Sequence, residues 1–244
     1  MRTALVSDVH GNAVGLEAVL ADLARVPVDQ VVALGDMVQG GPHPAEVVDR
    51  IAELGWPVVL GNADAFLLDP DAGSEPASEP QLEARAWSVA QLGPERLEVL
   101  RGFVPTVTAP LGGGRTLLAF HGSPTSFDDF LFPETPEGVF RQLVAEADAD
   151  VLAGGHIHLQ FVRRLGDAFF VNPGSAGLSY DHEQAGDGFR ADPWAAYAIV
   201  EVREGGLVEV AFRRVPFDAE SVAAAVIASG MPHAEATAER WQAR

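Results

Sequence analysis

Residues 3–12 read TALVSDVHGN, and this stretch decides the fold. The apolar run from Thr3 to Val6 is typical of a buried strand, and Asp8 and His10 follow where that strand ends. Asn12 is suited to cap the helix that comes next. The apolar face of that helix consists of Leu16, Val19, Leu20 and Leu23. The stretch therefore predicts a strand, a polar turn and a covering helix.

The first third of the chain repeats this alternation of strand and helix. Gln30–Leu34 is predicted as the next buried strand and Pro57–Leu60 as a third. Between them, Pro44–Leu54 is predicted to be a helix, because proline suits the first helical turn. Strands separated by helices predict a parallel sheet that is covered by helices.

The rest of the chain predicts a second set of strands and several helices. The strands are Val107–Leu111, Thr116–Phe120, Val151–Ala153, Phe161–Leu165, Ala168–Val171, Ala196–Val202 and Val208–Val215. The helices are Leu82–Leu92, Pro94–Leu100, Pro136–Ala147 and a C-terminal helical segment, 218–244, that Asp218 caps. Leu68–Pro80 is rich in Pro, Asp, Glu and Ser and is expected to be a mobile loop. We therefore expect a single α/β domain over residues 1–244, in which two sheets pack face to face with helices outside.

Charge limits the classes of partner. The chain has 35 Asp and Glu against 16 Lys and Arg, a formal net charge of −19, and such a surface repels polymeric nucleic acid. A small anionic substrate would need local positive charge, which bound metal ions usually supply. There is no cysteine, so disulfides and thiolate metal sites are excluded.

The apolar runs of the sequence are all too short to cross a bilayer, so we expect no membrane partner. The start of the chain lacks a basic stretch followed by a long apolar one, so no signal peptide is predicted. The expected location is therefore the cytoplasm. The sequence pattern predicts no particular oligomeric state.

Residues that can bind metal ions follow each of five predicted strands. They are Asp8 and His10, Asp36, Asn62, His121, and His156 with His158. The carboxyl ends of parallel strands open onto one crevice, so these side chains are expected to meet. Residues two apart in an extended segment point the same way, which would turn Asp8 and His10 toward one ion. His156 and His158 would do the same on condition that the backbone stays extended there. Imidazole and carboxylate ligands together suit Mn, Fe, Zn or Ni better than Ca or Mg.

This ordered set resembles the signature of the calcineurin-like metallophosphoesterase superfamily. The matching motifs are Asp8-Val9-His10, Gly35-Asp36, Gly61-Asn62, His121 and Gly155-His156-Ile157-His158. The resemblance covers about residues 1 to 180 and implies a four-layer α/β/β/α sandwich of two mixed sheets flanked by helices. It also implies a hydrolase of small phosphate esters that uses two divalent transition-metal ions, manganese foremost.

The resemblance further implies a role for each ligand. One ion would be held by Asp8, His10, Asp36 and His158, and the second by Asp36, Asn62, His121 and His156. Asp36 would thus bridge the two ions. Asp36, Asn62 and His121 are the candidate catalytic residues. The segment Asn172-Pro173-Gly174-Ser175 looks like the turn that follows the metal site in bacterial members of the family.

Ala63 is a departure from the family pattern. Many relatives carry histidine at this position, in a GNH[DE] motif, and that histidine resembles a general acid that protonates the leaving oxygen. The methyl group of alanine cannot donate a proton, and general acid catalysis typically raises a reaction rate about 10²–10⁴-fold. Three interpretations follow: substrates with leaving groups of low pKa, a substitute acid such as Asp64 or His43, or a metal-binding scaffold with little turnover.

The expected function is therefore hydrolysis of small phosphate esters, with phosphodiesters favoured. The alternatives are a Ser/Thr-type or nucleotide phosphomonoesterase and the scaffold protein. Three loops are expected to shape the pocket, Leu68–Pro80, Ser123–Pro133 and Leu178–Pro193. The middle loop carries Phe127, Phe130 and Phe132, a cluster that is more typical of local core than of a binding surface.

Overall fold

Two mixed β-sheets form the centre of the fold in the computed structural model, which describes residues 1–73, 76–184 and 190–242. The first sheet has the strand order β2-β1-β8-β9. Its strands are β1 (Arg2–Val6), β2 (Gln30–Ala33), β8 (Trp194–Val202) and β9 (Val208–Pro216). β1 and β2 are parallel, whereas β8 runs antiparallel to β1, so this sheet is mixed.

The second sheet has the order β3-β4-β5-β7-β6. Its strands are β3 (Val107–Gly112), β4 (Arg115–Ala119), β5 (Val151–Ala153), β6 (Gln160–Leu165) and β7 (Ala168–Pro173). The central strands β4, β5 and β7 are parallel, and both edge strands are antiparallel to their neighbours. The parallel centre brings the carboxyl ends of β4 and β5 to the same edge.

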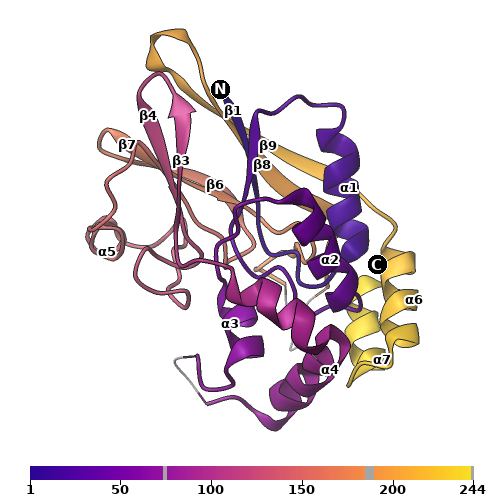
Figure 1. Cartoon of the computed structure of the whole chain (residues 1–244). Coiled ribbons are helices and arrows are strands. Elements are labelled where there is room, and N and C mark those ends of the chain that lie inside the picture. Colours follow the sequence, from indigo (N-terminus) through magenta and orange to yellow (C-terminus); the bar gives the residue numbers. More distant parts are fainter. Residues whose placement is uncertain (74–75, 185–189, 243–244) are drawn as a thin grey trace.

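Helices cover the outer face of each sheet (Figure 1). They are α1 (Ala13–Leu23), α2 (Pro44–Leu54), α3 (Asn62–Leu68), α4 (Glu79–Arg101), α5 (Glu137–Leu143), α6 (Ala219–Ser229) and α7 (Ala234–Ala238). Figure 1 shows α1 and α2 on one side of the molecule and α5 on the other. Asn12 caps α1 as predicted, because its side chain accepts a hydrogen bond from the Gly15 N–H at 3.1 Å.

Three layers of apolar side chains hold the sheets and helices together: the first lies between the first sheet and helices α1 and α2, the second between the two sheets, and the third between the second sheet and α5. Ala4 and Val6 of β1 pack against α1 and α2, while Leu5 points the other way and packs against the second sheet. Both faces of β1 are thus buried, which is why its sequence is continuously apolar rather than alternating. On the far side, Phe170 of the second sheet packs against Phe140 of α5. The expected four-layer α/β/β/α sandwich is therefore confirmed.

Several predicted elements differ in extent. The predicted strand Pro57–Leu60 is reduced to isolated bridges at Val58 and Val59. The two predicted helices on either side of Gly93 form one element, α4, with a break at Gly93, whose φ is 66°. Pro94 sits directly after that break, where its missing N–H is tolerated. The predicted helix Pro136–Ala147 is shorter, because α5 ends at Leu143.

The segment that was expected to be a mobile loop, Leu68–Pro80, is bounded on both sides by helix. Leu68 is the last residue of α3, and α4 begins at Glu79. The Gln81 side chain accepts a hydrogen bond from the Ser78 N–H at 2.9 Å, which starts α4 earlier than the apolar pattern indicated. Residues 74 and 75 of this prediction lie outside the described residues.

The C-terminal segment 218–244, predicted to be helical, contains the helices α6 and α7, and its residues 243 and 244 lie outside the described residues. Asp218 caps α6 by accepting a hydrogen bond from the Glu220 N–H at 3.0 Å. α6 and the residues after it form their own apolar cluster, which includes Val222 and Trp241 and also contacts Val14 of α1. Among the described residues, no helix combines the length and the apolar character that a membrane span requires.

Candidate metal centre

The carboxyl ends of β1, β2, β4 and β5 converge on one site that joins the two sheets. The Asp8 N–H donates to the Gly35 carbonyl at 3.0 Å, which connects the segments after β1 and β2. The His156 N–H donates to Asp8 Oδ2 at 3.2 Å, which connects the first sheet to the second. The site therefore lies where the ends of both sheets meet, as the strand-end pattern predicted.

Asp8, His10 and His158 form a first cluster of potential ligands. His10 Nε2 lies 3.0 Å from His158 Nε2, and His158 Nε2 lies 3.3 Å from Asp8 Oδ1. The Asp8 side chain is completely buried. Three donor atoms thus point into one small space.

Asp36, His121 and His156 form a second cluster. His121 Nε2 lies 3.3 Å from Asp36 Oδ2 and 3.0 Å from Asn62 Oδ1, so the asparagine joins this group. The rings of His121 and His156 are 5.0 Å apart between centroids. All seven residues that the sequence singled out are thus brought to one place.

Asp36 connects the two clusters. Its Oδ2 atom lies 3.3 Å from His121 Nε2 in one cluster and 3.8 Å from His10 Nε2 in the other. Its Oδ1 atom accepts a hydrogen bond from the Ala63 N–H at 2.8 Å. One carboxylate is therefore anchored by the backbone while it faces both clusters.

Backbone carbonyls set the orientation of three of the imidazole rings. The Nδ1 atoms of His10, His121 and His158 lie 2.7–2.8 Å from the carbonyl oxygens of Gln39, Leu34 and Leu178. A carbonyl can only accept, so each Nδ1 carries a hydrogen and Nε2 is the nitrogen that faces the site, where it offers its lone pair whenever the ring is neutral. This arrangement orients histidine ligands toward metal ions in proteins.

The donor set fits divalent metal ions. Among the described residues, Asp8 Oδ1 and His156 Nε2 are buried polar atoms without a hydrogen-bond partner. Such atoms are costly to bury unless something else satisfies them. His10 Nε2 and His158 Nε2 face each other at 3.0 Å, so a proton or a cation has to lie between them. Imidazole nitrogens with carboxylate and amide oxygens suit transition metals.

Electrostatics inside the site follow from burial and from neighbouring charges. Burial alone would lower the pKa of His121, but the Asp36 carboxylate raises it to about 10. Burial and the positive charge of His121 lower the pKa of His156 to about 4. Burial would raise the pKa of Asp8, yet His158 holds it below its usual value. Protons and cations thus compete for the same buried atoms.

The local backbone differs from the expected extended form. The φ angles are 55° at Asp8, 48° at His10, 53° at Asp36, 70° at His156 and 58° at His158. The prediction that residues two apart point the same way because the chain is extended is therefore wrong. The side chains converge because the chain turns through the left-handed region at five of the seven proposed ligands.

Two glycines are required by close approach rather than by turning. A Cβ atom at Gly61 would lie 2.1 Å from Asp36 Oδ1. A Cβ atom at Gly155 would lie 2.1 Å from Ser7 Oγ and 2.9 Å from Asp8 Oδ2. All three distances are shorter than real Cβ contacts allow, so only glycine at these two positions lets the loops approach the Asp36 and Asp8 carboxylates.

Asp64 has a role that the sequence did not indicate. It is fully buried and accepts hydrogen bonds from the Met37 and Val38 N–H groups, each at 3.1 Å. Burial and the charge of Asp36 raise its pKa to about 7. The carboxylate therefore holds the turn that follows Asp36. It does not cap its own helix, and it is not exposed to a substrate.

The predicted turn at Asn172–Ser175 lies against the site. Ser175 Oγ donates to the Asp8 carbonyl at 2.7 Å, and Asn172 Nδ2 donates to the Gly155 carbonyl at 2.6 Å. Both side chains are buried. The turn therefore holds the loops that carry Asp8 and His156 in place through these two hydrogen bonds.

Phe130 was expected to belong to local core, and that prediction is wrong. Its side chain is 57% exposed, and its ring lies 4.5 Å from the His156 ring. It stacks on Phe132 at 5.8 Å with nearly parallel planes. A cavity of about 430 Å³ is lined by His121 and by the first part of the Ser123–Pro133 loop, around Phe127. The Ser123–Pro133 loop therefore lines the site, as predicted.

Residues 1–205 match the family model of the calcineurin-like phosphoesterase superfamily domain. The chain belongs to this superfamily. A metallophosphoesterase from Sphaerobacter thermophilus superposes with a TM-score of 0.76 at 26% identity, covering 99% of this chain and 98% of that one. The hypothetical protein PH1004 from Pyrococcus horikoshii OT3 gives a TM-score of 0.81 at 21% identity over 97% and 96% of the two chains.

Some curated relatives carry functional names. Phosphodiesterase YfcE of Escherichia coli K12 is 26% identical over 188 residues, which cover 73% of this chain and 80% of that protein. Family membership identifies the chain as a metal-dependent phosphoric ester hydrolase, and the two Asp/His clusters are able to bind divalent metal ions.

Proposed function

We propose that the chain hydrolyses small phosphate esters, with phosphodiesters favoured, at a centre of two divalent transition-metal ions. The ligands would be Asp8, His10, Asp36, Asn62, His121, His156 and His158, and manganese is the first choice of metal. The observation that carries the proposal is the position of Asp36, whose Oδ2 atom lies within 3.8 Å of a histidine nitrogen in each cluster.

The chain's own residues prepare the site for a phosphate. Bound divalent ions would neutralise phosphoryl oxygens and lower the pKa of a coordinated water. Asp8 and Asp36 are the only two carboxylates in the proposed ligand set, so a positive charge would remain to attract the substrate. Backbone carbonyls hold the imidazole rings in place before substrate arrives, which removes the need to reorganise them.

Ala63 favours diesters over monoesters. Its N–H still donates to Asp36 Oδ1 at 2.8 Å, so the backbone function of this position is retained. Its methyl group offers no proton to a leaving oxygen. Esters whose leaving group departs as a stable anion need no such proton, and the name of the Escherichia coli relative supports the diester choice.

Two measurements on one preparation test the proposal. Elemental analysis should find two equivalents of metal per chain, and manganese-loaded protein should hydrolyse bis(p-nitrophenyl) phosphate faster than p-nitrophenyl phosphate. A faster monoester rate would instead support the phosphomonoesterase. Metal content without turnover of either ester would support the scaffold protein.

Asp36→Asn should remove most of the activity. Metal stabilisation of a transition state is worth several kcal/mol, so kcat/KM for the diester is expected to fall about 10³-fold. Bound metal should fall below one equivalent, because both clusters lose a shared negative ligand. Asp167→Asn is the matched control, since Asp167 is exposed in the turn before β7, and should change neither quantity. An Asp36→Asn protein with full metal content and full rate would refute the bridging role.

A further inference from the structure

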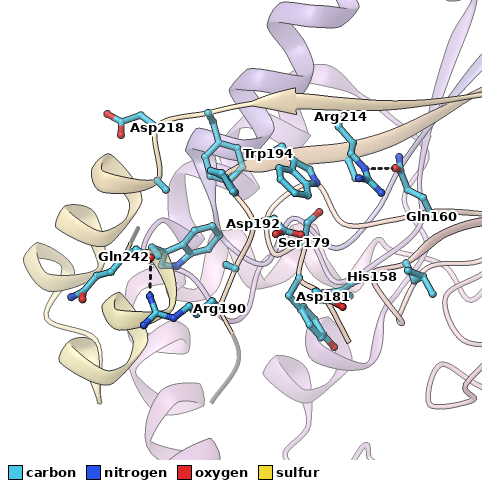
Figure 2. A pocket seen from close by; sticks show the side chains of 18 of the residues that line it. His158, Gln160, Ser179, Asp181, Arg190, Asp192, Trp194, Arg214, Asp218 and Gln242 are labelled. Carbon is cyan, nitrogen blue, oxygen red and sulfur yellow. Dashed lines mark hydrogen bonds between the residues drawn. The ribbon is translucent and has the colours of Figure 1, made fainter. Parts of the chain in front are cut away.

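A cavity of about 830 Å³ opens beside His158 and extends toward the C-terminal helices. Figure 2 shows His158 on one side of this cavity and Asp218 and Gln242 on the other. Its volume lies within the range of pockets that hold small organic ligands, roughly 300–1,000 Å³. His158 thus belongs both to the metal centre and to the wall of this cavity.

Part of the cavity is built by residues beyond the family domain, which ends at residue 205. The chain end is fixed to the segment before β8, because the Ala191 N–H donates to the Arg240 carbonyl at 2.8 Å. The Phe217 N–H donates to the Pro193 carbonyl at 3.0 Å. These bonds attach the C-terminal wall firmly to the family domain.

The walls carry aromatic rings along the length of the cavity. Tyr180 lies next to the centre, with its ring 5.5 Å from the His158 ring. Farther in, Phe217 packs on Trp241 at 5.8 Å. Trp194 also lines the cavity, and the Arg214 guanidinium carbon lies 5.3 Å from the centre of its ring. Aromatic and guanidinium planes are the surfaces on which bases and other flat rings stack.

The charge of the cavity disfavours a second phosphate. Its lining includes the carboxylates of Asp181, Asp192, Asp218 and Glu220, against the two arginines Arg190 and Arg214. Gln160 Oε1 accepts a hydrogen bond from Arg214 Nε at 3.0 Å, which holds that guanidinium against Trp194 (Figure 2). An uncharged ring system suits this surface better than a polyphosphate chain does.

We propose that this cavity binds the organic arm of a phosphodiester substrate, and that the arm carries an uncharged aromatic base, as a nucleoside does. The proposal rests on the proposed function, since it places the phosphate at the metal centre beside His158. The arm then extends past Tyr180 toward Trp194. The C-terminal segment is a specificity element that the family domain alone does not contain.

Two diesters with the same leaving group and the same charge test this proposal. They are thymidine 5′-(p-nitrophenyl) phosphate, which carries a base on its other arm, and methyl p-nitrophenyl phosphate, which does not. Wild-type protein with manganese is expected to show a kcat/KM at least tenfold higher for the thymidine ester. Trp194→Ala should lower that selectivity ratio about tenfold, the usual effect of losing one stacking partner of a base.

The controls separate a local effect from a general one. Trp56→Ala makes the same substitution in a residue that packs against the first apolar layer, away from the cavity, and should leave the ratio unchanged. Ala219→Trp fills the cavity from the start of α6 and should lower the ratio as Trp194→Ala does, which keeps the test decisive if Trp194→Ala does not fold.

A direct binding measurement distinguishes failure of this proposal from failure of the proposed function. Calorimetric titration with thymidine should give binding to wild type that is at least tenfold weaker in Trp194→Ala, even if neither ester is hydrolysed. In that case the hydrolase proposal would fall and the base site would stand. Equal rates on the two esters in wild type, or thymidine binding that Trp194→Ala does not weaken, would overturn the base site.

Discussion

Five of the seven proposed ligands have a left-handed backbone, and this is the main physical feature of the site at the scale of single residues. Non-glycine residues in this region carry a strain of about 1–3 kcal/mol each. The His10 N–H donates to the Asp36 carbonyl at 2.9 Å, and the Asp8 N–H donates to the Gly35 carbonyl at 3.0 Å. These bonds hold the strained turns, so the positions of the donor atoms are set before any ligand binds.

Ala63→His should restore a proton donor beside the site. The expected result is a rate on diphenyl phosphate, whose leaving group is poor, that rises about 10²-fold. The rate on bis(p-nitrophenyl) phosphate should change much less, because its leaving group needs no proton. The measurement is the ratio of kcat/KM for the two diesters, with elemental analysis to show that metal content is intact.

Ala63→Gln is the control for that substitution, since it adds a polar side chain of similar length that cannot act as an acid at neutral pH. It should leave the ratio near the wild-type value. If histidine raised both rates equally, or if glutamine had the same effect as histidine, the missing acid would not explain the preference for diesters.

The ligands could be predicted from sequence because each one follows an apolar strand in the same order as the family motifs. Their φ angles could not, since an alternating pattern assumes extended backbone beyond the end of the strand. The hydrogen bonds of Asp64 and the exposure of Phe130 could not be predicted for a different reason. Their surroundings depend on which loops meet in space, and local sequence does not report that.

At the scale of elements, a partly buried carboxylate connects α1 to the first sheet. Asp22 of α1 accepts hydrogen bonds from Tyr197 of β8 at 2.7 Å and from Arg213 of β9 at 2.6 and 3.0 Å. The Asp22 side chain is 14% exposed. The hydrogen bonds from Arg213 and Tyr197 outweigh burial and hold the pKa of Asp22 below its usual value of 3.8.

Asp22→Asn should therefore destabilise the fold in a pH-dependent way. Hydrogen bonds to a charged group contribute about 1.5–3 kcal/mol, and Arg213 is partly exposed, so about 1–2 kcal/mol of unfolding free energy should be lost at pH 7. Because the folded pKa is depressed, the difference from wild type is complete above the usual aspartate pKa. It shrinks as the pH falls through the lower folded pKa.

Urea denaturation of metal-free protein at pH 7, 5 and 3 measures this difference. Asp167→Asn should match wild type at each pH, since Asp167 is exposed. A gap that stayed constant or widened at pH 3 would show that the Asp22 charge is not what fastens α1.

The elements were predicted more accurately in type than in extent. α4 begins earlier than its apolar pattern because a side-chain hydrogen bond at Ser78 starts it. The strand after Pro57 shrinks to two bridges because its neighbours are only Ala33 and Val104. The loop Leu178–Pro193 was expected to shape the pocket, and several of its described residues do line the large cavity, while residues 185–189 lie outside the described residues. The contribution of the chain end to that cavity was not predicted, because it depends on contacts between segments that are distant in sequence.

At the scale of the whole molecule, the C-terminal helices are part of the same packed body as the family domain. Val222 and Trp241 share an apolar cluster with Val14 of α1 and with Trp87 of α4. Trp241 is only 6% exposed. These contacts support our proposal that residues 1–244 form a single domain, since the apolar cluster of the C-terminal segment is shared with residues of α1 and α4.

At this scale we predict that the whole chain unfolds in one cooperative transition and that bound metal raises the midpoint temperature of that transition. Thermal melts followed by circular dichroism and by tryptophan fluorescence should coincide, because the four tryptophans, Trp56, Trp87, Trp194 and Trp241, report on distant parts of the fold. Manganese at about 100 times its Kd should stabilise the fold by about 2.7 kcal/mol for each bound ion. In a chain of this size each ion therefore raises Tm by roughly 5–10 °C. Asp36→Asn should lose the shift but keep the single transition. Two separate transitions, of which only one responds to manganese, would contradict the single domain, because the C-terminal helices would then melt independently of the centre.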